Sequence, residues 1–187
     1  MAEILLTSEN FVKGVTSISD NLAGKYLRPS IREAQDTGLR SILGDTLLEK
    51  LKALVADGSI SQEGNAMYKA LVDQAQYYLA YSAVVDVAAK VSYKIVNFGV
   101  AKSSDENLEI ASAEEIGRMQ TFYQSKADHS CLQLQNWLLN HCASFPELNE
   151  GDLHRIHSNL YSAATCGIWL GGPRGKRLPG TPVNERK

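Results

Sequence analysis

The sequence predicts an all-α fold, a helical bundle with two long antiparallel helices and shorter helices in its amino-terminal half. Two observations predict it. Apolar side chains recur every three or four residues between Met67 and Ala89, and the same spacing follows a helix-start signal at Ser112. We expect these two helices at about 63–91 and 113–143, with the shorter helices packed across them. An extended loop or small hairpin joins the long helices, and an extended tail follows them.

The amino-terminal half contains several helix boundaries. Pro29 suits the first turn of a helix, and the run Asp36-Thr37-Gly38 is typical of a break. A short helical turn over 39–43 ends at Gly44. Asp45 can then accept hydrogen bonds from the first amides of a leucine-rich helix, which Asp57-Gly58 closes.

The first long helix carries two apolar stripes. One consists of Met67, Leu71, Ala75, Tyr78, Ser82, Val85 and Ala89, and the other of Val72, Leu79, Ala83 and Val87. Two stripes on one helix indicate that it is contacted from more than one side. We therefore expect this helix to be central and Leu71 to be buried.

The second long helix has a well-marked start and end. The Ser112 hydroxyl can accept from the first-turn amides, while Glu115 can bond back to the Ser112 amide in a capping box. Pro146 ends the helix, because residues before proline avoid helical angles. The predicted apolar face consists of Ile116, Met119, Tyr123, Ala127, Leu134, Trp137, Leu138 and His141.

The segment between the long helices, Ser92 to Ile110, is either a small hairpin or an extended loop. It is too polar for deep burial and longer than an ordinary connection, which favours a role in contacts. Lys94 and Asn97 can donate hydrogen bonds to a neighbouring molecule, and Asp105 and Glu106 can accept them. We predict that Ser92 to Asn107 contacts neighbouring copies of the chain or a partner protein.

The chain changes character after Pro146, so we divide it into a helical domain over 1–146 and a carboxyl-terminal segment over 147–187. A short amphipathic stretch around Leu153, Ile156 and Leu160 precedes a proline-containing basic tail. Large apolar residues next to glycines in such a tail either fold back onto the domain or insert into a partner. The candidate interface residues here are the apolar Ile168, Trp169 and Leu170 and the basic Arg174, Lys176 and Arg177.

Composition excludes several classes of protein. Nineteen Lys and Arg stand against 21 Asp and Glu, a formal net charge of −2, so no general basic field would collect nucleic acid. No stretch has the roughly 18 to 20 apolar residues of a membrane span, and the first residues lack the basic flank of a secretion signal. Three irregularly spaced cysteines fit reduced thiols. We expect a protein made in the cytoplasm, with no membrane partner.

The sequence contains no complete motif for catalysis or for metal binding. Gly175-Lys176 resembles part of a phosphate-binding loop, but Leu170 and Arg177 occupy positions where that motif needs Gly and Ser or Thr. Neither Cys131 nor Cys142 has the turn that usually presents a nucleophile. The pair His154 and His157 lacks a matching second pair for zinc. We expect no enzyme activity, no cofactor and no metal site.

Three blocks in order resemble a known family. They are Pro29-Ser30-Ile31-Arg32-Glu33-Ala34-Gln35-Asp36, then Ile42-Leu43-Gly44, and then Ser92-Tyr93-Lys94-Ile95-Val96-Asn97-Phe98-Gly99-Val100. Over about residues 20 to 143 the chain resembles head-tail connector proteins of tailed bacteriophages, most closely the adaptor or ring proteins of crAss-like gut phages and related prophages.

The resemblance implies a structural virion protein. Copies would form a ring, expected to be a dodecamer, docked under the portal protein at the capsid vertex and linking it to the tail or to other ring proteins. Such a ring would enclose viral DNA without sequence-specific binding. It would be assembled in the cytoplasm of the bacterial host.

Two other functions stay open. A small nucleic-acid-binding protein would use the basic tail, and its affinity would fall steeply with salt. A helical metalloenzyme would use the histidines, and elemental analysis would detect its metal.

Overall fold

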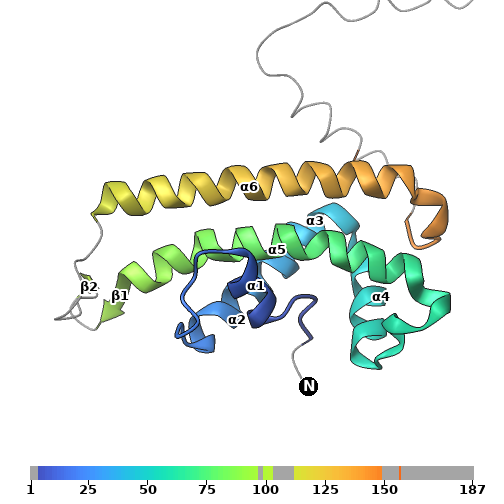
Figure 1. Ribbon diagram of the computed structural model, residues 1–187, viewed down its shortest axis with the longest axis horizontal. Coiled ribbons are helices and arrows are strands. Elements are labelled where there is room, and N and C mark those ends of the chain that lie inside the picture. The colour runs from blue at the N-terminus through green and yellow to red at the C-terminus, as the bar shows by residue number, and fades with distance from the viewer. Residues whose placement is uncertain (1–3, 97–98, 103–111, 149–155, 157–187) are drawn as a thin grey trace, which may run out of the picture.

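The computed structural model describes residues 4–96, 99–102, 112–148 and 156. Within them the fold is all-α, a helical bundle with one small hairpin (Figure 1). The longer helices are α1 (Glu9–Val15), α2 (Gly24–Glu33), α4 (Asp45–Ala56), α5 (Ala66–Ser92) and α6 (Ala113–Asn140). The shorter elements are the π-helix η1 (Ala34–Leu39), α3 (Arg40–Leu43), and the 3-10 turns η2 (Ser59–Ser61), η3 (Glu63–Asn65) and η4 (Cys142–Ser144).

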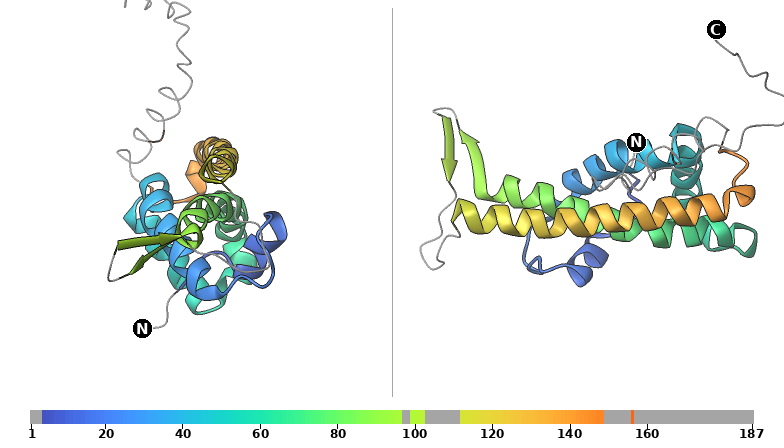
Figure 2. Two further views of the ribbon diagram at one scale, coloured as in Figure 1. Left: turned by 90° about the vertical axis from the view of Figure 1, so that its left-hand side faces the viewer. Right: turned by 90° about the horizontal axis from the view of Figure 1, so that it is seen from above.

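The two long helices lie side by side and antiparallel, as the sequence predicts (Figures 1 and 2). Helix α6 lies along one side of α5, and α1 and α2 lie on the other side. Helix α5 is therefore the central element, which explains why it carries two apolar stripes. Its length of 27 residues corresponds to about 40 Å at 1.5 Å per residue.

Two clusters of buried apolar side chains lie along α5. The first joins its amino-terminal half to α3, α4 and the end of α6, and it includes Leu71, Leu134, Phe145 and Ile156. The second joins its carboxyl-terminal half to α1, α2 and Tyr123 of α6. The predicted burial of Leu71 and Leu134 is confirmed, since both are at most 1% exposed.

The hairpin confirms one of the two forms expected for the loop between the long helices. Strand β1 (Tyr93–Val96) pairs antiparallel with β2 (Gly99–Lys102), in a register that sets Tyr93 opposite Lys102 and Val96 opposite Gly99. The strands project at the end of the helix pair (Figure 2).

The predicted capping box is also confirmed. The Glu115 amide donates to Ser112 Oγ at 3.2 Å, and the Ser112 amide donates to Glu115 Oε2 at 2.7 Å. The hydrogen bond from the Ser112 amide, and then that from the Ser112 side chain, lower the pKa of the Glu115 carboxyl. The helix ends at Asn140, three residues earlier than predicted, and the chain continues as the 3-10 turn η4 up to Phe145.

Three predicted boundaries in the amino-terminal half are wrong. Pro29 lies inside α2 and not in its first turn, because the helix begins early enough to bury Leu27 together with Ile31 on the same face. The predicted break at Asp36-Thr37-Gly38 is helical, within η1. Asp45 is the first residue of α4, with Gly44 at the cap position, and its carboxylate pairs with Arg40 at 2.7 Å.

Helix α1 was not predicted from the sequence. It begins at Ser8, whose Oγ accepts a hydrogen bond from the Phe11 amide at 3.1 Å. The segment before α1 is held by Gln35, whose Oε1 accepts from the Leu6 amide at 2.9 Å and whose Nε2 donates to the Ile4 carbonyl at 3.1 Å. Among the described residues, no helix combines the length and the apolar character needed to cross a membrane.

Candidate interaction site between helices α5 and α6

An open groove of about 510 Å³ runs between α5 and α6. We call it the α5–α6 groove. Its lining comes from one face of each helix, because residues three or four apart on a helix lie on the same side. Helix α5 contributes Gln74, Tyr77 and Tyr81, and α6 contributes Phe122, Ser125, Lys126, His129, Ser130 and Gln133.

Aromatic side chains dominate the exposed part of this groove. Phe122 is 55% exposed and Tyr77 is 45% exposed, and Met119, one turn before Phe122, is 39% exposed. They are the exposed large apolar side chains of the part of the chain that the structure describes. Because folding normally buries such groups, their gathering along one helix pair makes this flank a candidate interaction surface.

The exposed aromatic rings of the groove are held in place by contacts with other aromatic rings. Tyr77 makes an edge contact with Phe11 of α1, and Phe122 makes one with Tyr123, with ring centroids 5.4 and 5.2 Å apart. Tyr123 is itself buried, and its hydroxyl accepts a hydrogen bond from the Ser17 amide at 2.9 Å. The exposed rings therefore rest on a packed support.

Lys126 supplies a positive charge among these rings. Its ammonium lies 4.7 Å from the Phe122 ring centroid and 5.3 Å from that of Tyr81, which is within cation–π range. Within the described residues it forms no ion pair with a carboxylate. The groove thus combines aromatic walls with a cation that has no carboxylate partner in this part of the chain, and such a surface suits an acidic and apolar partner.

A second groove, of about 370 Å³, is lined by residues of α2, η1 and α5 and by Gln124 of α6, and its lining mixes polar and apolar side chains. The charges around it are already paired. Lys90 pairs with Glu33 at 3.2 Å and with Asp86, and it donates to Ser30 Oγ at 3.3 Å. Burial disfavours the charged ammonium, but these hydrogen bonds and carboxylates outweigh it and raise the pKa of Lys90. This groove is better explained as a polar contact between α2 and α5.

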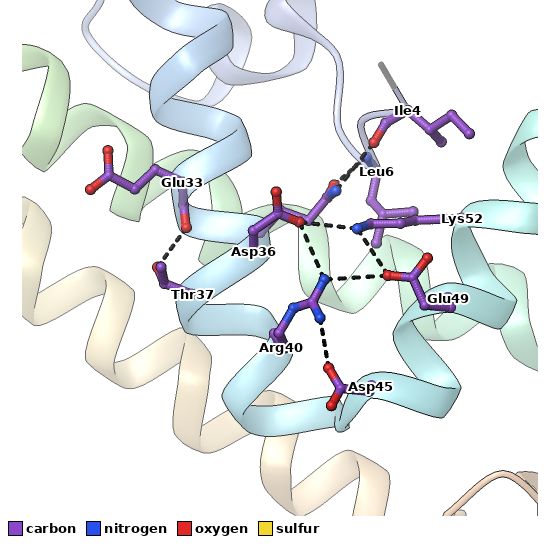
Figure 3. A network of polar contacts seen from close by, with 10 residues as sticks. Ile4, Leu6, Glu33, Asp36, Thr37, Arg40, Asp45, Glu49 and Lys52 are labelled. Carbon is purple, nitrogen blue, oxygen red and sulfur yellow. Dashed lines mark hydrogen bonds and ion pairs between the residues drawn. The ribbon is translucent and has the colours of Figure 1, made fainter. Parts of the chain in front are cut away.

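A network of five charged side chains joins η1 and α3 to α4 (Figure 3). Arg40 lies 2.7 Å from Asp45 and 3.3 Å from Glu49, and Lys52 lies 3.0 Å from Asp36 and 3.3 Å from Glu49. Every cation of the network faces at least one carboxylate. The network orients α4 against η1, and it offers no free charge for a ligand.

Within the described residues, the fold does not bring the cysteine and histidine side chains together into a catalytic or metal site. Burial, and then the charge of Asp128, raise the pKa of the Cys131 thiol, so the reactive thiolate is disfavoured. Within the described residues no group of three or more His, Cys, Asp or Glu side chains could hold a metal ion. His154, His157 and Cys166 lie outside the described residues.

The interface residues predicted from the sequence lie mostly beyond the described part of the chain. The backbone of Lys94 lies in β1, opposite Ala101. Outside the described residues lie Asn97, Asp105, Glu106, Ile168, Trp169, Leu170, Arg174, Lys176 and Arg177.

The α5–α6 groove was not predicted from the sequence. One signal could have pointed to it. Tyr77 and Phe122 each fall one position outside the predicted apolar stripe of their helix, next to Tyr78 and Tyr123, so both helices carry an additional aromatic residue on the flank of the core face.

Comparison with known proteins gives one match. The model of a family described as "Family of unknown function (DUF6712)" matches residues 39–154, which is more than half of the chain. No curated protein and no solved structure matches the chain. The matched residues include both long helices, the hairpin and all the residues that line the α5–α6 groove.

Proposed function

Because the chain belongs to the DUF6712 family, whose function is unknown, we propose a function from its structure and sequence. The protein is a structural subunit that assembles with copies of itself into a ring. This ring is the head-tail connector of a tailed bacteriophage, located in the virion between the portal protein and the tail.

The observation that carries the proposal is the row of exposed apolar side chains on α6 and α5. Among the described elements, α6 packs mainly against α5, so its outer flank is uncovered. A helix on the outside of a bundle normally presents polar groups to water, yet α6 presents Phe122 and Met119. A protein–protein contact along this flank would remove both from water.

The hairpin is a second feature that suits assembly. A two-stranded sheet leaves both of its outer edges without a partner strand in the described part of the chain. Unpaired strand edges readily pair with another chain. Because the hairpin projects from the end of the bundle, it is available to a neighbouring subunit.

The resemblance supports the identity of the ring. Its three blocks form the end of α2 with the start of η1, the end of α3 with Gly44, and the end of α5 with the hairpin. A head-to-tail contact repeated around a rotation axis closes into a ring, here expected to be a dodecamer.

A net charge of −2 suits a channel through which DNA passes without being held.

Co-expression with the portal protein of the same phage genome tests the proposal. We expect the full chain to sediment with the portal as one large assembly in a density gradient. The proposal fails if the chain stays at the top of the gradient as a monomer. If it then binds duplex DNA, with an affinity that falls steeply with salt, nucleic-acid binding by the basic tail becomes the better account.

A further inference from the structure

The α5–α6 groove requires a partner with two properties. The exposed rings of Tyr77 and Phe122 require apolar side chains to cover them. The ammonium of Lys126, which no carboxylate of the described residues neutralises, requires an acidic group. A basic segment would meet like charge at Lys126, which weighs against the tail that carries Arg174 and Arg177 as the occupant.

One segment of this chain has both properties. Residues 103–111 read Ser-Ser-Asp-Glu-Asn-Leu-Glu-Ile-Ala and lie outside the described residues. They contain the acidic Asp105, Glu106 and Glu109, the apolar Leu108 and Ile110, and no basic residue. We propose that the α5–α6 groove is the contact between neighbouring subunits, and that its occupant is the segment 103–111 of a second copy. This inference rests on the proposed ring function.

The length of the segment favours a second copy over the same chain. The segment is tied to Lys102 at the end of β2 and to Ser112 at the start of α6. Ten peptide steps at about 3.4 Å span roughly 34 Å, so the middle of the loop reaches about 17 Å from its anchors. Lys126 and His129 lie about 21 to 26 Å along α6 from Ser112, at 1.5 Å per residue. The segment of the same chain therefore falls short of the middle of the groove.

The placement of the two surfaces also determines the type of assembly. The segment is anchored at Lys102 and at Ser112, directly before α6, whereas α6 lines the groove with residues from Phe122 to Gln133. Two different surfaces that fit each other form a head-to-tail contact, and such contacts generate rings when the rotation closes.

Charge reversal at Lys126 tests the proposal in the full-length protein. Lys126→Glu should weaken assembly on the portal at least about tenfold, because it sets like charge against the acidic segment. The matched control is Lys69→Glu, which reverses an exposed lysine of α5 outside the groove and should stay within about twofold of the wild type. Circular dichroism establishes that both variants are folded.

A compensating variant tests the occupant. The double change Asp105→Lys with Glu106→Lys should also weaken assembly, and adding Lys126→Glu to it should restore most of the loss, since opposite charges then face each other again. Restoration by Lys126→Glu, but not by Lys69→Glu, is the expected result. The inference is overturned if the double change has no effect, or if adding Lys126→Glu restores nothing.

The outcomes separate this inference from the proposed function. If Lys126→Glu assembles on the portal as well as the wild type does, the groove is not the subunit contact, and the ring function stands. If the wild type forms no assembly either alone or with the portal, both proposals fail. A synthetic peptide of residues 166–177 that blocks assembly, where a peptide of residues 103–111 does not, assigns the groove to the tail and overturns the inference.

Discussion

Gly38→Ala is expected to destabilise the protein, although alanine is ordinarily the better helix former. Gly38 lies in the π-helix η1, where the backbone passes close to Tyr78 of α5. A Cβ at this position would lie 1.9 Å from Tyr78 Oη, about 1.5 Å closer than the 3.4 Å at which ordinary contact begins. Tyr78 packs against the first buried cluster, so its ring has little room to move aside.

The magnitude follows from two opposing effects. Overpacking of a filled interior lowers the free energy of unfolding by about 1 to 3 kcal/mol. Replacing glycine by alanine in a helix raises it by up to about 1 kcal/mol. We expect Gly38→Ala to lower the free energy of unfolding by about 1 to 2 kcal/mol. Gly117→Ala is the matched control, because nothing lies within 4 Å of its Cβ position in α6, and it should stabilise by about 0.5 to 1 kcal/mol.

A double-mutant cycle isolates the clash. Tyr78→Phe alone should cost about 1 kcal/mol, because it removes the hydroxyl that bonds with Ser82. In the Gly38→Ala background the same change removes the clashing atom and leaves ring carbons at 3.0 and 3.2 Å, so it should stabilise. Urea unfolding followed by circular dichroism measures all four proteins. The reasoning is refuted if Gly38→Ala is as stable as Gly117→Ala, or if the two changes are additive.

Three further predictions concern the packing and the ends of the long helices. Leu71→Ala and Leu134→Ala should each cost roughly 2 to 5 kcal/mol in urea unfolding, and a loss below about half a kilocalorie at both would contradict the assigned core. Ser112→Ala should cost about 1 kcal/mol through loss of the capping box, and an unchanged midpoint would count against that role. Burial, together with the hydrogen bond to Glu147 and its charge, raises the pKa of Tyr68 to about 12. The stabilisation of neutral Tyr68, about 1 kcal/mol, is then complete below pH 10 and is lost as the pH rises through about 12. The stability difference between wild type and Tyr68→Phe should shrink over that range, and a constant difference would show that the bond to Glu147 does not matter.

Local signals predicted the long helices well. Capping is a short-range interaction, so Ser112 and Glu115 could be paired from their spacing alone. The left-handed Gly58, with φ 74°, ends α4 where the Asp57-Gly58 signal places its end. The hairpin could be named only as one of two options, since its strands are short and pair only with each other.

The misplaced boundaries depend on tertiary contacts that the local pattern does not contain. Gly38 is typical of a break, but in this fold its missing side chain makes room for Tyr78, forty residues away. Pro29 marks a helix start in isolation, whereas the burial of Leu27 against α5 extends α2 towards the amino terminus. Propensity is a weak signal when burial opposes it.

The α5–α6 groove was missed for a related reason. The periodicity of a helix identifies the face that is buried, but it does not give the rotation and register of one helix against another. Tyr77 and Phe122 border their predicted stripes, and only the pairing of α5 with α6 sets both of them beside Lys126. A sequence with a broad apolar face therefore leaves open which of its aromatic residues stay exposed.

Electron microscopy of the protein assembled with its portal tests the central claim most directly. The account predicts a closed ring of copies coaxial with the portal, in which the flank of α6 that carries Phe122 meets the neighbouring subunit. Images of portals without an added ring, or a ring in which Phe122 and Lys126 face solvent, would contradict it.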